Sequence, residues 1–395
     1  MMSQPTEKLS SMARYSRLAR TRTFRDGGVA RWQRATIGVA GAGQLGSRLA
    51  QEIVLSGAQV RVYDFEIGRE ENLGTQLVEP AVPKVNSVVG ACDAIRPGRA
   101  HGVQTDIRHV GIAELAELDL LVDCTDDAGL VMPLAHISNG IGLPLLRLAV
   151  DGSGESELGR IAYFHGSGEA ADGKCHACPM CAYDLRQILK RTHRVGCNEW
   201  TATRDPTFAG GALAMMVTGA GLLQAQRIVT GNDTHLVLDQ EIVIDADHWQ
   251  MLRLTRQSSA ECLSGHVKWN LIGLPNPVSE TSFRELFSTA VQHLGRSGLS
   301  LEPYAHPLCT EALCPCGTRR HAVGTQWAER PSCDDCKNTM MYLRETARYR
   351  LDQSRLDETK IADVPLAKLG LPSGAMFVAR VAGRPPVRFV LPWKS

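Results

Sequence analysis

Three glycines near the start of the chain have the spacing of a phosphate-binding loop. They are Gly41, Gly43 and Gly46 in the sequence GAGQLG, between a short apolar run and an amphipathic stretch. Glycine lets the backbone turn tightly and approach an anionic phosphate, and the helix that follows offers N–H donors and partial positive charge. Asp64 ends the next expected strand, where a ribose-binding carboxylate belongs. These features alone fit a dinucleotide-dependent dehydrogenase as well as an ATP-dependent enzyme.

Most of the twelve cysteines fall in short pairs. Cys175, Cys178 and Cys181 form two overlapping C-x-x-C knuckles, which present thiolates from a tight turn as zinc requires. A second set, Cys314, Cys316, Cys333 and Cys336, predicts a small structural zinc ribbon, because so short a region has little core of its own. Disulfides are the alternative in a secreted chain, but such pairs are typical of metal sites in a reducing compartment.

The elements that position these residues alternate between strand and helix. Strands are expected at 35–41, 59–63, 99–104, 118–122 and 144–149, helices at 44–56, 83–95 and 208–229, and an antiparallel strand at 237–244. This order predicts an α/β fold with a Rossmann-like, open, mostly parallel sheet and an antiparallel extension. A small region with a zinc ribbon is expected to follow it.

Composition excludes several classes of protein. A net charge of +1 argues against a general nucleic-acid binder. No uninterrupted apolar run reaches the roughly 18 residues that span a bilayer. The first thirty residues lack the apolar core of a secretory signal, so the cytoplasm is the expected location, with no membrane partner.

Five motifs in order separate the two nucleotide-binding classes. They are Arg14-Tyr15-Ser16-Arg17, the glycine loop, Asp64-Phe65-Glu66 continuing to Asn72-Leu73-Gly74-Thr75-Gln76, Pro83-Lys84, and Asp123-Cys124-Thr125-Asp126-Asp127. Together they resemble the ThiF/MoeB superfamily, which includes the ubiquitin-activating enzymes, across roughly residues 12–265. The resemblance implies adenylation of a protein C-terminal carboxylate with ATP and Mg²⁺, a reaction that needs cations and precise alignment more than a general base.

The resemblance also implies roles for individual residues. Asp64 would bind the ribose, and Asn72 and Lys84 would contact the phosphates, with Glu66 and Gln76 completing the nucleotide site. Asp126 would hold magnesium, and Arg17 would act as an arginine finger reaching in from the partner subunit of a homodimer. Three plainer interpretations stay open: Asp126 as a helix cap, Lys84 as a solvated lysine and Arg17 as a surface arginine.

One position departs from the pattern. The family's arginine after Asn-Leu-x is Thr75 here, which removes an expected phosphate contact. The neighbouring Arg69 is a candidate replacement. This departure keeps open a non-catalytic subunit that only docks a modifier.

The resemblance supplies the second half of the first zinc site and a candidate nucleophile. A second pair of ligands is expected after the antiparallel strands, where Cys262 and His266 stand in a C-x-x-x-H sequence. Cys178, Cys181, Cys262 and His266 are therefore the predicted ligands, with Cys175 as the substitute. Cys197 stands alone in the crossover region, where activating enzymes carry a thioester-forming or sulfur-carrying cysteine.

Two enzymatic functions follow from these expectations. The first is activation of a ubiquitin-like modifier, with thioester transfer to Cys197 and then to a conjugating enzyme. The second is activation of a sulfur-carrier protein of the thiamine or molybdopterin type. The expected domains are an N-terminal helical arm (1–33), an adenylation domain with the first zinc and the crossover loop (34–266), and a zinc- and partner-binding extension (267–395).

Overall fold

The structure, a computed structural model, describes residues 13–152, 156–166, 175–183, 210–232, 235–295 and 297–393. The chain divides into two compact units. Unit 1 comprises Met1–Ile107 and Leu118–Lys268, and unit 2 comprises Arg108–Glu117 and Trp269–Ser395. Each unit has its own hydrophobic core.

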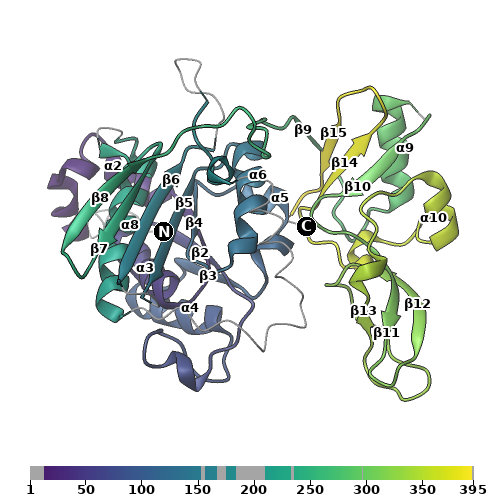
Figure 1. The fold of residues 1–395 in the computed structure, drawn as a ribbon, viewed down its shortest axis with the longest axis horizontal. Coiled ribbons are helices and arrows are strands. Elements are labelled where there is room, and N and C mark those ends of the chain that lie inside the picture. Colours follow the sequence, from purple (N-terminus) through teal and green to yellow (C-terminus); the bar gives the residue numbers. More distant parts are fainter. Residues whose placement is uncertain are drawn as a thin grey trace, which may run out of the picture. The chain divides into compact units, whose positions relative to one another are not determined.

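Unit 1 is built on one eight-stranded sheet (Figure 1). The order is β3-β2-β1-β4-β5-β6-β7-β8, with parallel pairing from β3 to β5 and antiparallel pairing from β5 to β8. This confirms the predicted fold class. The bounds are β1 (Thr36–Ala40), β2 (Gln59–Tyr63), β3 (Ala100–Val103), β4 (Leu120–Asp123), β5 (Leu145–Asp151), β6 (Leu158–Phe164), β7 (Gln240–Asp245) and β8 (Gln250–Thr255).

Helices cover the sheet because each has an apolar stripe to bury. In α3 (Gln44–Ser56), Leu45, Leu49 and Ile53 repeat at helical spacing and are buried. This helix packs against α4 (Lys84–Ile95) on one side and α8 (Gly211–Thr230) on the other. The chain moves in the opposite direction from β4 through α6 (Val131–Ile141) to β5, so right-handed crossovers place α6 on the other face of the sheet.

Within the described residues, only α8 is long and apolar enough by composition to cross a membrane. It packs against β5, β6 and α3, and Leu213, Ala214 and Val217 are almost fully buried in the core of unit 1. Its apolar composition is therefore explained by its place across the sheet. Ahead of β1, η1 (Leu18–Arg20), η2 (Arg22–Phe24) and α2 (Gly28–Arg34) also join this unit, and α2 packs on α8.

Unit 2 contains two further sheets. The larger has the order β10-β14-β15-β9 and is formed by β9 (Leu271–Gly273), β10 (Ser300–Pro303), β14 (Met376–Arg380) and β15 (Val387–Val390). Its core includes Phe283, Phe377 and Phe389, the first contributed by α9 (Phe283–Leu294). Ser282 caps α9 through a reciprocal hydrogen-bonded box with Glu285. The unit also contains α5 (Ile112–Leu115) and α10 (Gln353–Thr359).

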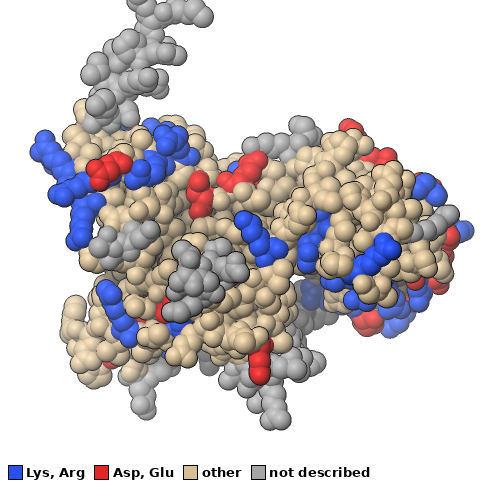
Figure 2. Space-filling model, turned by 90° about the horizontal axis from the view of Figure 1, so that it is seen from above, with Lys and Arg blue, Asp and Glu red and all other residues tan. Residues whose placement is uncertain are grey.

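The smaller sheet of unit 2 carries the paired cysteines. Its order is β12-β11-β13, formed by β11 (Cys309–Leu313), β12 (Arg319–Gly324) and β13 (Met341–Tyr342). Besides η1 and η2, the 3-10 turns among the described residues are η3 (Glu70–Asn72), η4 (Ile107–His109), η5 (Ala128–Leu130), η6 (Pro179–Ala182), η8 (Arg344–Thr346) and η9 (Leu366–Leu369). On the face shown in Figure 2, basic and acidic side chains both occur.

Candidate nucleotide site and paired zinc sites

The residues predicted to bind the nucleotide lie at the point where the strand order of the sheet reverses, between β1 and β4. β1 lies between β2 and β4, so the crossover helices leave β1 and β4 on opposite sides. In open α/β sheets such a switch point leaves a crevice outside the carboxyl ends of the strands. The glycine loop follows β1, Asp64 follows β2, and Asp123 ends β4.

The three loop glycines meet different steric demands. Gly41 has φ of +93° and lies against the backbone of Cys124. A Cβ on Gly46 would lie 1.8 Å from the carbonyl oxygen of Gly41, so α3 can begin this close to β1 only with glycine there. A Cβ on Gly43 would meet nothing within 4 Å, which leaves space above the loop for a ligand.

Asp64 ties the glycine loop to the end of β2. Its Oδ2 accepts a hydrogen bond from the Ala42 N–H at 2.7 Å, and its Oδ1 accepts one from the Glu66 N–H at 2.8 Å. Burial raises the pKa of Asp64, and the two N–H donors and Lys84 oppose that rise. Each oxygen keeps acceptor capacity, as a ribose-binding carboxylate needs.

Lys84 is a buried cation rather than a solvated lysine. It is 4 % exposed at the first position of α4, and its Nζ forms an ion pair with Glu66. The plainer interpretation of Lys84 is therefore wrong. A bridge between Ile67 and Pro83 closes the loop that brings the two side chains together. Asp64, Glu66 and Lys84 thus form one charged cluster beside the glycine loop.

The segment that follows carries the other predicted phosphate ligands. Asn72 ends η3, and its Oδ1 accepts a hydrogen bond from the Arg69 N–H at 2.9 Å. Gln76 has a buried Oε1 with no hydrogen-bond partner among the described residues. Arg69 pairs with Glu71, and both side chains are more than 70 % exposed, so the structure gives Arg69 no link to the loop.

An ion pair that sequence reasoning missed lies at the ends of β4 and β5. Asp123 is 1 % exposed, and its Oδ2 accepts a hydrogen bond from Arg147 Nε at 2.8 Å. Its Oδ1 accepts from the N–H and the hydroxyl of Thr125, which shapes the turn after β4. An arginine inside the apolar run LLRLAV was the signal that could have identified this pair.

Asp126 and Asp127 have different surroundings after the turn that follows β4. Asp127 is the N-cap of η5 and accepts a hydrogen bond from the Gly129 N–H at 2.7 Å. Because Asp127 occupies the N-cap, the interpretation of Asp126 as the helix cap is wrong, and Asp126 itself is exposed. Its role as a magnesium ligand stays a prediction, and a hard carboxylate at the carboxyl end of a strand suits that ion.

The N-terminal motif divides into a buried and an exposed part. Tyr15 packs on Gly57, and its hydroxyl accepts a hydrogen bond from Arg96 Nη1 at 2.6 Å. Arg17 is exposed as the N-cap residue of η1, and its side chain makes no hydrogen bond or ion pair to a described residue. The structure does not bring Arg17 to the glycine loop within one chain, and its action on a partner subunit stays a prediction.

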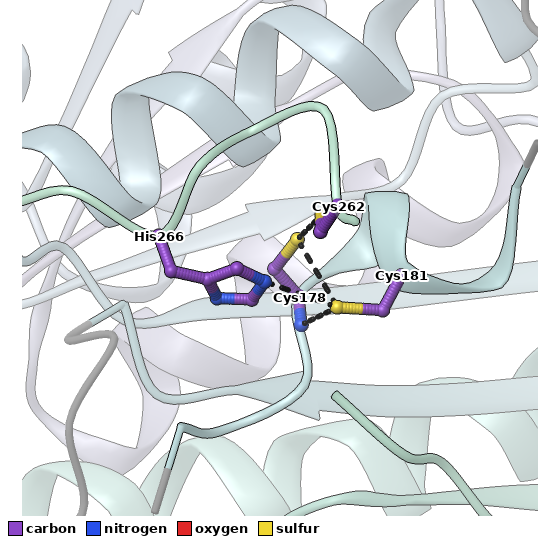
Figure 3. A group of neighbouring side chains, drawn as sticks. All are labelled: Cys178, Cys181, Cys262 and His266. Carbon is purple, nitrogen blue, oxygen red and sulfur yellow. Dashed lines mark hydrogen bonds between the residues drawn. The ribbon is translucent and has the colours of Figure 1, made fainter. Parts of the chain in front are cut away.

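The first predicted zinc ligands converge from two distant segments (Figure 3). The ligand atoms of Cys178, Cys181, Cys262 and His266 lie within 4.8 Å of one another. Cys178 Sγ is 3.5 Å from Cys262 Sγ and 3.8 Å from Cys181 Sγ, close to the about 3.8 Å that tetrahedral zinc imposes on two thiolates. The donor set therefore fits a closed structural zinc site.

The described residues around this group support the cysteine ligands but not the outer nitrogen of the histidine. Ser264 Oγ lies 3.2 Å from Cys178 Sγ and 3.3 Å from Cys262 Sγ. Hydrogen bonding to Cys181 raises the pKa of His266 to about 10. Nδ1 of His266 is buried with no partner among the described residues, although outer nitrogens of zinc-bound histidines usually have one. Cys175 is exposed and lies outside the group.

The second set of ligands lies in unit 2 at the ends of the small sheet. The sulfurs of Cys314, Cys316, Cys333 and Cys336 also lie within 4.8 Å of one another. Cys314 Sγ is 3.3 Å from Cys336 Sγ, and Cys316 Sγ is 3.7 Å from Cys333 Sγ. Gly317, with φ of +94°, makes the tight turn after the C-x-C pair. Four thiolates in this arrangement can bind zinc.

The candidate nucleophile has no structural description. Cys197 lies outside the described residues, in the stretch between Tyr183 and Gly210. Its role as a thioester-forming cysteine stays a prediction.

The chain matches one protein family and is similar to several solved structures. The ThiF family profile matches residues 15–264, well over half of the chain. Similar solved structures include E. coli MccB with MccA-N7isoASN (12 % identity, TM-score 0.50, 65 % of this chain and 75 % of that chain) and PaaA (13 %, 0.48, 62 % and 73 %). At 12 % identity the likeness to MccB shows the fold alone. No curated protein sequence matches this chain.

The order of the motifs and the extent of the family match settle membership. The matched region begins at Tyr15 and ends at Ser264, so it includes the glycine loop, Lys84, Asp126 and most of the first cysteine group. The chain therefore belongs to the ThiF family, the adenylyltransferase family that its motifs resemble.

Proposed function

We propose that this chain uses ATP and Mg²⁺ to adenylate the C-terminal carboxylate of a ubiquitin-like modifier. The observation that carries the proposal is the cluster of Asp64, Glu66 and buried Lys84 against the glycine loop at the switch point of the sheet. A dehydrogenase site has no need for a buried lysine there. A triphosphate does, because its charge has to be neutralised where water is excluded.

The proposed reaction makes one bond and breaks one. A carboxylate oxygen of the modifier attacks the α-phosphorus, and the bond from that phosphorus to the bridging oxygen of pyrophosphate breaks. The electron pair leaves with pyrophosphate, so no proton transfer is needed. Lys84 would stabilise charge on the phosphates, Asn72 and Gln76 would orient them, and Asp64 would hold the ribose.

Magnesium would be held at Asp126, where it supplies charge neutralisation for the leaving pyrophosphate. The residues present fit this ion. A carboxylate is a ligand suited to magnesium, and Asp126 is exposed just beyond the carboxyl end of β4.

The second step we propose is transfer of the modifier to Cys197 as a thioester and then to a conjugating enzyme. A thiolate would attack the acyl carbon of the adenylate, and AMP would leave. We also propose a homodimer in which Arg17 acts on the partner's site, two structural zinc ions per chain, and the cytoplasm as the location. The domains 34–266 and 267–395 would then separate adenylation from partner binding.

Pyrophosphate exchange tests the first step. The full chain is incubated with MgATP, labelled pyrophosphate and a small modifier ending in glycine. Label should enter ATP with the wild type, and Asp126→Asn should reduce exchange at least about 100-fold. Glu280→Gln, an exposed acid in unit 2, is the matched control and should exchange normally. Full exchange by Asp126→Asn would show that the metal ligand is misplaced.

A thioester assay separates conjugation from sulfur transfer. Conjugation predicts a modifier adduct that a reducing thiol removes and that Cys197→Ala abolishes while exchange continues. Formation of a thiocarboxylate on the modifier, without a stable adduct on Cys197, would favour the sulfur-carrier alternative. Loss of exchange in every variant, including the wild type, would favour a non-catalytic docking subunit.

A further inference from the structure

A second cation is fixed beside the glycine loop. Arg48 lies one turn into α3, and its Nη1 donates to the carbonyl oxygens of Gln44 and Thr75, each at 2.8 Å. These two bonds hold the guanidinium between the first turn of α3 and the segment that carries Asn72 and Gln76. We propose that Arg48 binds the β- and γ-phosphates of ATP and the pyrophosphate that leaves, an assignment that rests on the proposed function.

Arg48 keeps donors for such a ligand. The side chain is partly buried, and only its Nη1 has hydrogen-bond partners among the described residues. Its Nη2 lies 3.9 Å from where a Cβ on Gly211 would stand, and glycine leaves that position at the start of α8 open. The Nη2 and Nε hydrogens therefore offer a fork that is already oriented, and such forks bind phosphate oxygens in a bidentate way.

The charges assigned to the site call for another cation. Among the described residues, Lys84 pairs with Glu66 and Arg147 pairs with Asp123, and Asp64 is a further carboxylate beside the loop. The charge of Lys84 is partly balanced by Glu66, and the charge of Arg147 is balanced by buried Asp123. A triphosphate would add further negative charge in a region of low dielectric constant. A guanidinium and a magnesium ion would reduce this excess.

The position of Arg48 also accounts for the departure at residue 75. Thr75 cannot supply positive charge, and the exposed pair of Arg69 with Glu71 does not bring a guanidinium to the loop. Arg48 reaches the backbone of residue 75 itself from a different element. Arg48 therefore places a guanidinium next to residue 75, where the family pattern has an arginine and this chain has a threonine.

A purely structural role makes a different prediction. If Arg48 served only to tie α3 to the segment around Thr75, its loss would disturb every nucleotide alike. Arg48→Gln keeps a neutral donor for one carbonyl and removes the charge. Because AMP lacks the β- and γ-phosphates, comparing ATP with AMP separates charge binding from tethering.

The test measures Kd for MgATP and for AMP by calorimetry on the full chain. Arg48→Gln should weaken ATP about 10- to 100-fold, as expected for a lost charge-assisted contact, and change AMP by less than about twofold. Arg48→Lys should lie between the wild type and Arg48→Gln. Thr75→Arg added to Arg48→Gln should recover most of the ATP affinity, because it returns a guanidinium to residue 75. Arg69→Gln is the control and should bind both nucleotides normally.

Each result decides the matter. Equal weakening of ATP and AMP, or unchanged ATP binding, would overturn the role of Arg48. If circular dichroism shows that Arg48→Gln is unfolded, the Arg48→Lys variant carries the test, and unchanged ATP affinity in it would overturn the proposal. A wild-type chain that binds neither nucleotide would instead contradict the proposed function.

Discussion

Lys84 forms an ion pair with Glu66 from a side chain that is only 5 % exposed. Glu66 is 39 % exposed, so the pair has one end in the interior and one toward solvent. A lysine at a helix start has no structural need to be buried in this way. The free-energy cost of removing its charge from water is offset by the ion pair with Glu66. This burial supports the proposal that Lys84 is a phosphate-binding cation of the nucleotide site.

Replacing Lys84 should separate activity from stability. Lys84→Met keeps the apolar stem and removes the charge, and it should reduce pyrophosphate exchange by about 100-fold or more. Because Glu66 reaches solvent, the loss of folding free energy should be small. Lys368→Met, an exposed lysine in unit 2, is the control for a general loss of charge. Normal pyrophosphate exchange by Lys84→Met would contradict the assignment of Lys84 to the nucleotide site.

The pair of Asp123 and Arg147 should be worth more to stability than any surface pair. Asp123 is 1 % exposed, so Arg147→Met would leave a buried charge without its partner and cost about 3–5 kcal/mol. Asp123→Asn combined with Arg147→Met should cost much less than the two single changes added together. Urea unfolding of the four proteins measures this coupling. Additive losses would show that the two side chains do not act as a pair.

Each cysteine group should hold one zinc ion. Metal analysis should give about two zinc per chain in the wild type and about one in Cys178→Ser and in Cys333→Ser. Cys175→Ser is the matched control, because Cys175 lies in the same knuckle but outside the group, and it should keep both. Two zinc ions in Cys333→Ser, or none in the wild type, would contradict the assignment.

Unit 2 should lose stability in acid through His306. Burial, with a contribution from His109, lowers the pKa of His306 to about 3, and neither ring nitrogen has a partner among the described residues. In the unfolded chain His306 binds a proton near pH 6.5, whereas in the folded chain it stays neutral until about pH 3. The contribution of His306 to the free energy of unfolding is therefore fully present above pH 6.5. It falls as pH drops from about 6.5 toward 3, by up to about 1.4 kcal/mol per pH unit.

His306→Phe should remove this contribution. The difference in pH dependence between wild type and variant is the quantity to measure, since both chains protonate their carboxylates. Trp327 stacks on His109, which stacks on His306, so tryptophan fluorescence can follow unfolding of this region. His321→Phe, at an exposed position, is the control. Identical pH profiles for wild type and His306→Phe would contradict the argument.

Local patterns predicted the elements of unit 1 well. β2 and α3 have the bounds that the sequence predicted, because Gly57 ends the helix and polar residues flank a short apolar strand. The spacing of the cysteine pairs predicted the group of Cys314, Cys316, Cys333 and Cys336 and the Cys178–Cys181 half of the other group, since each pair lies in a local turn. The joining of Cys178 to Cys262 depended on the family resemblance.

Contacts across elements could not be predicted in the same way. Arg48 and Thr75 are 27 residues apart, and Asp123 and Arg147 are 24 apart, so only the packing of strands and helices brings them together. Nothing in Arg108–Glu117 indicated that it belongs with unit 2, where the Ala113 N–H donates to the Gly374 carbonyl. Charged side chains in these positions carry no periodic signal, unlike the apolar face of a helix.

We propose that the glycine loop and Lys84 hold a triphosphate whose α-phosphate becomes joined to a protein carboxylate. A structure of the full chain soaked with MgATP tests it most directly. We expect phosphates over Gly43, with Lys84 and Arg48 bound to their oxygens, magnesium bound to Asp126 and the ribose bound to Asp64. A nucleotide bound elsewhere, or phosphates that Lys84 and Asp126 do not touch, would contradict it.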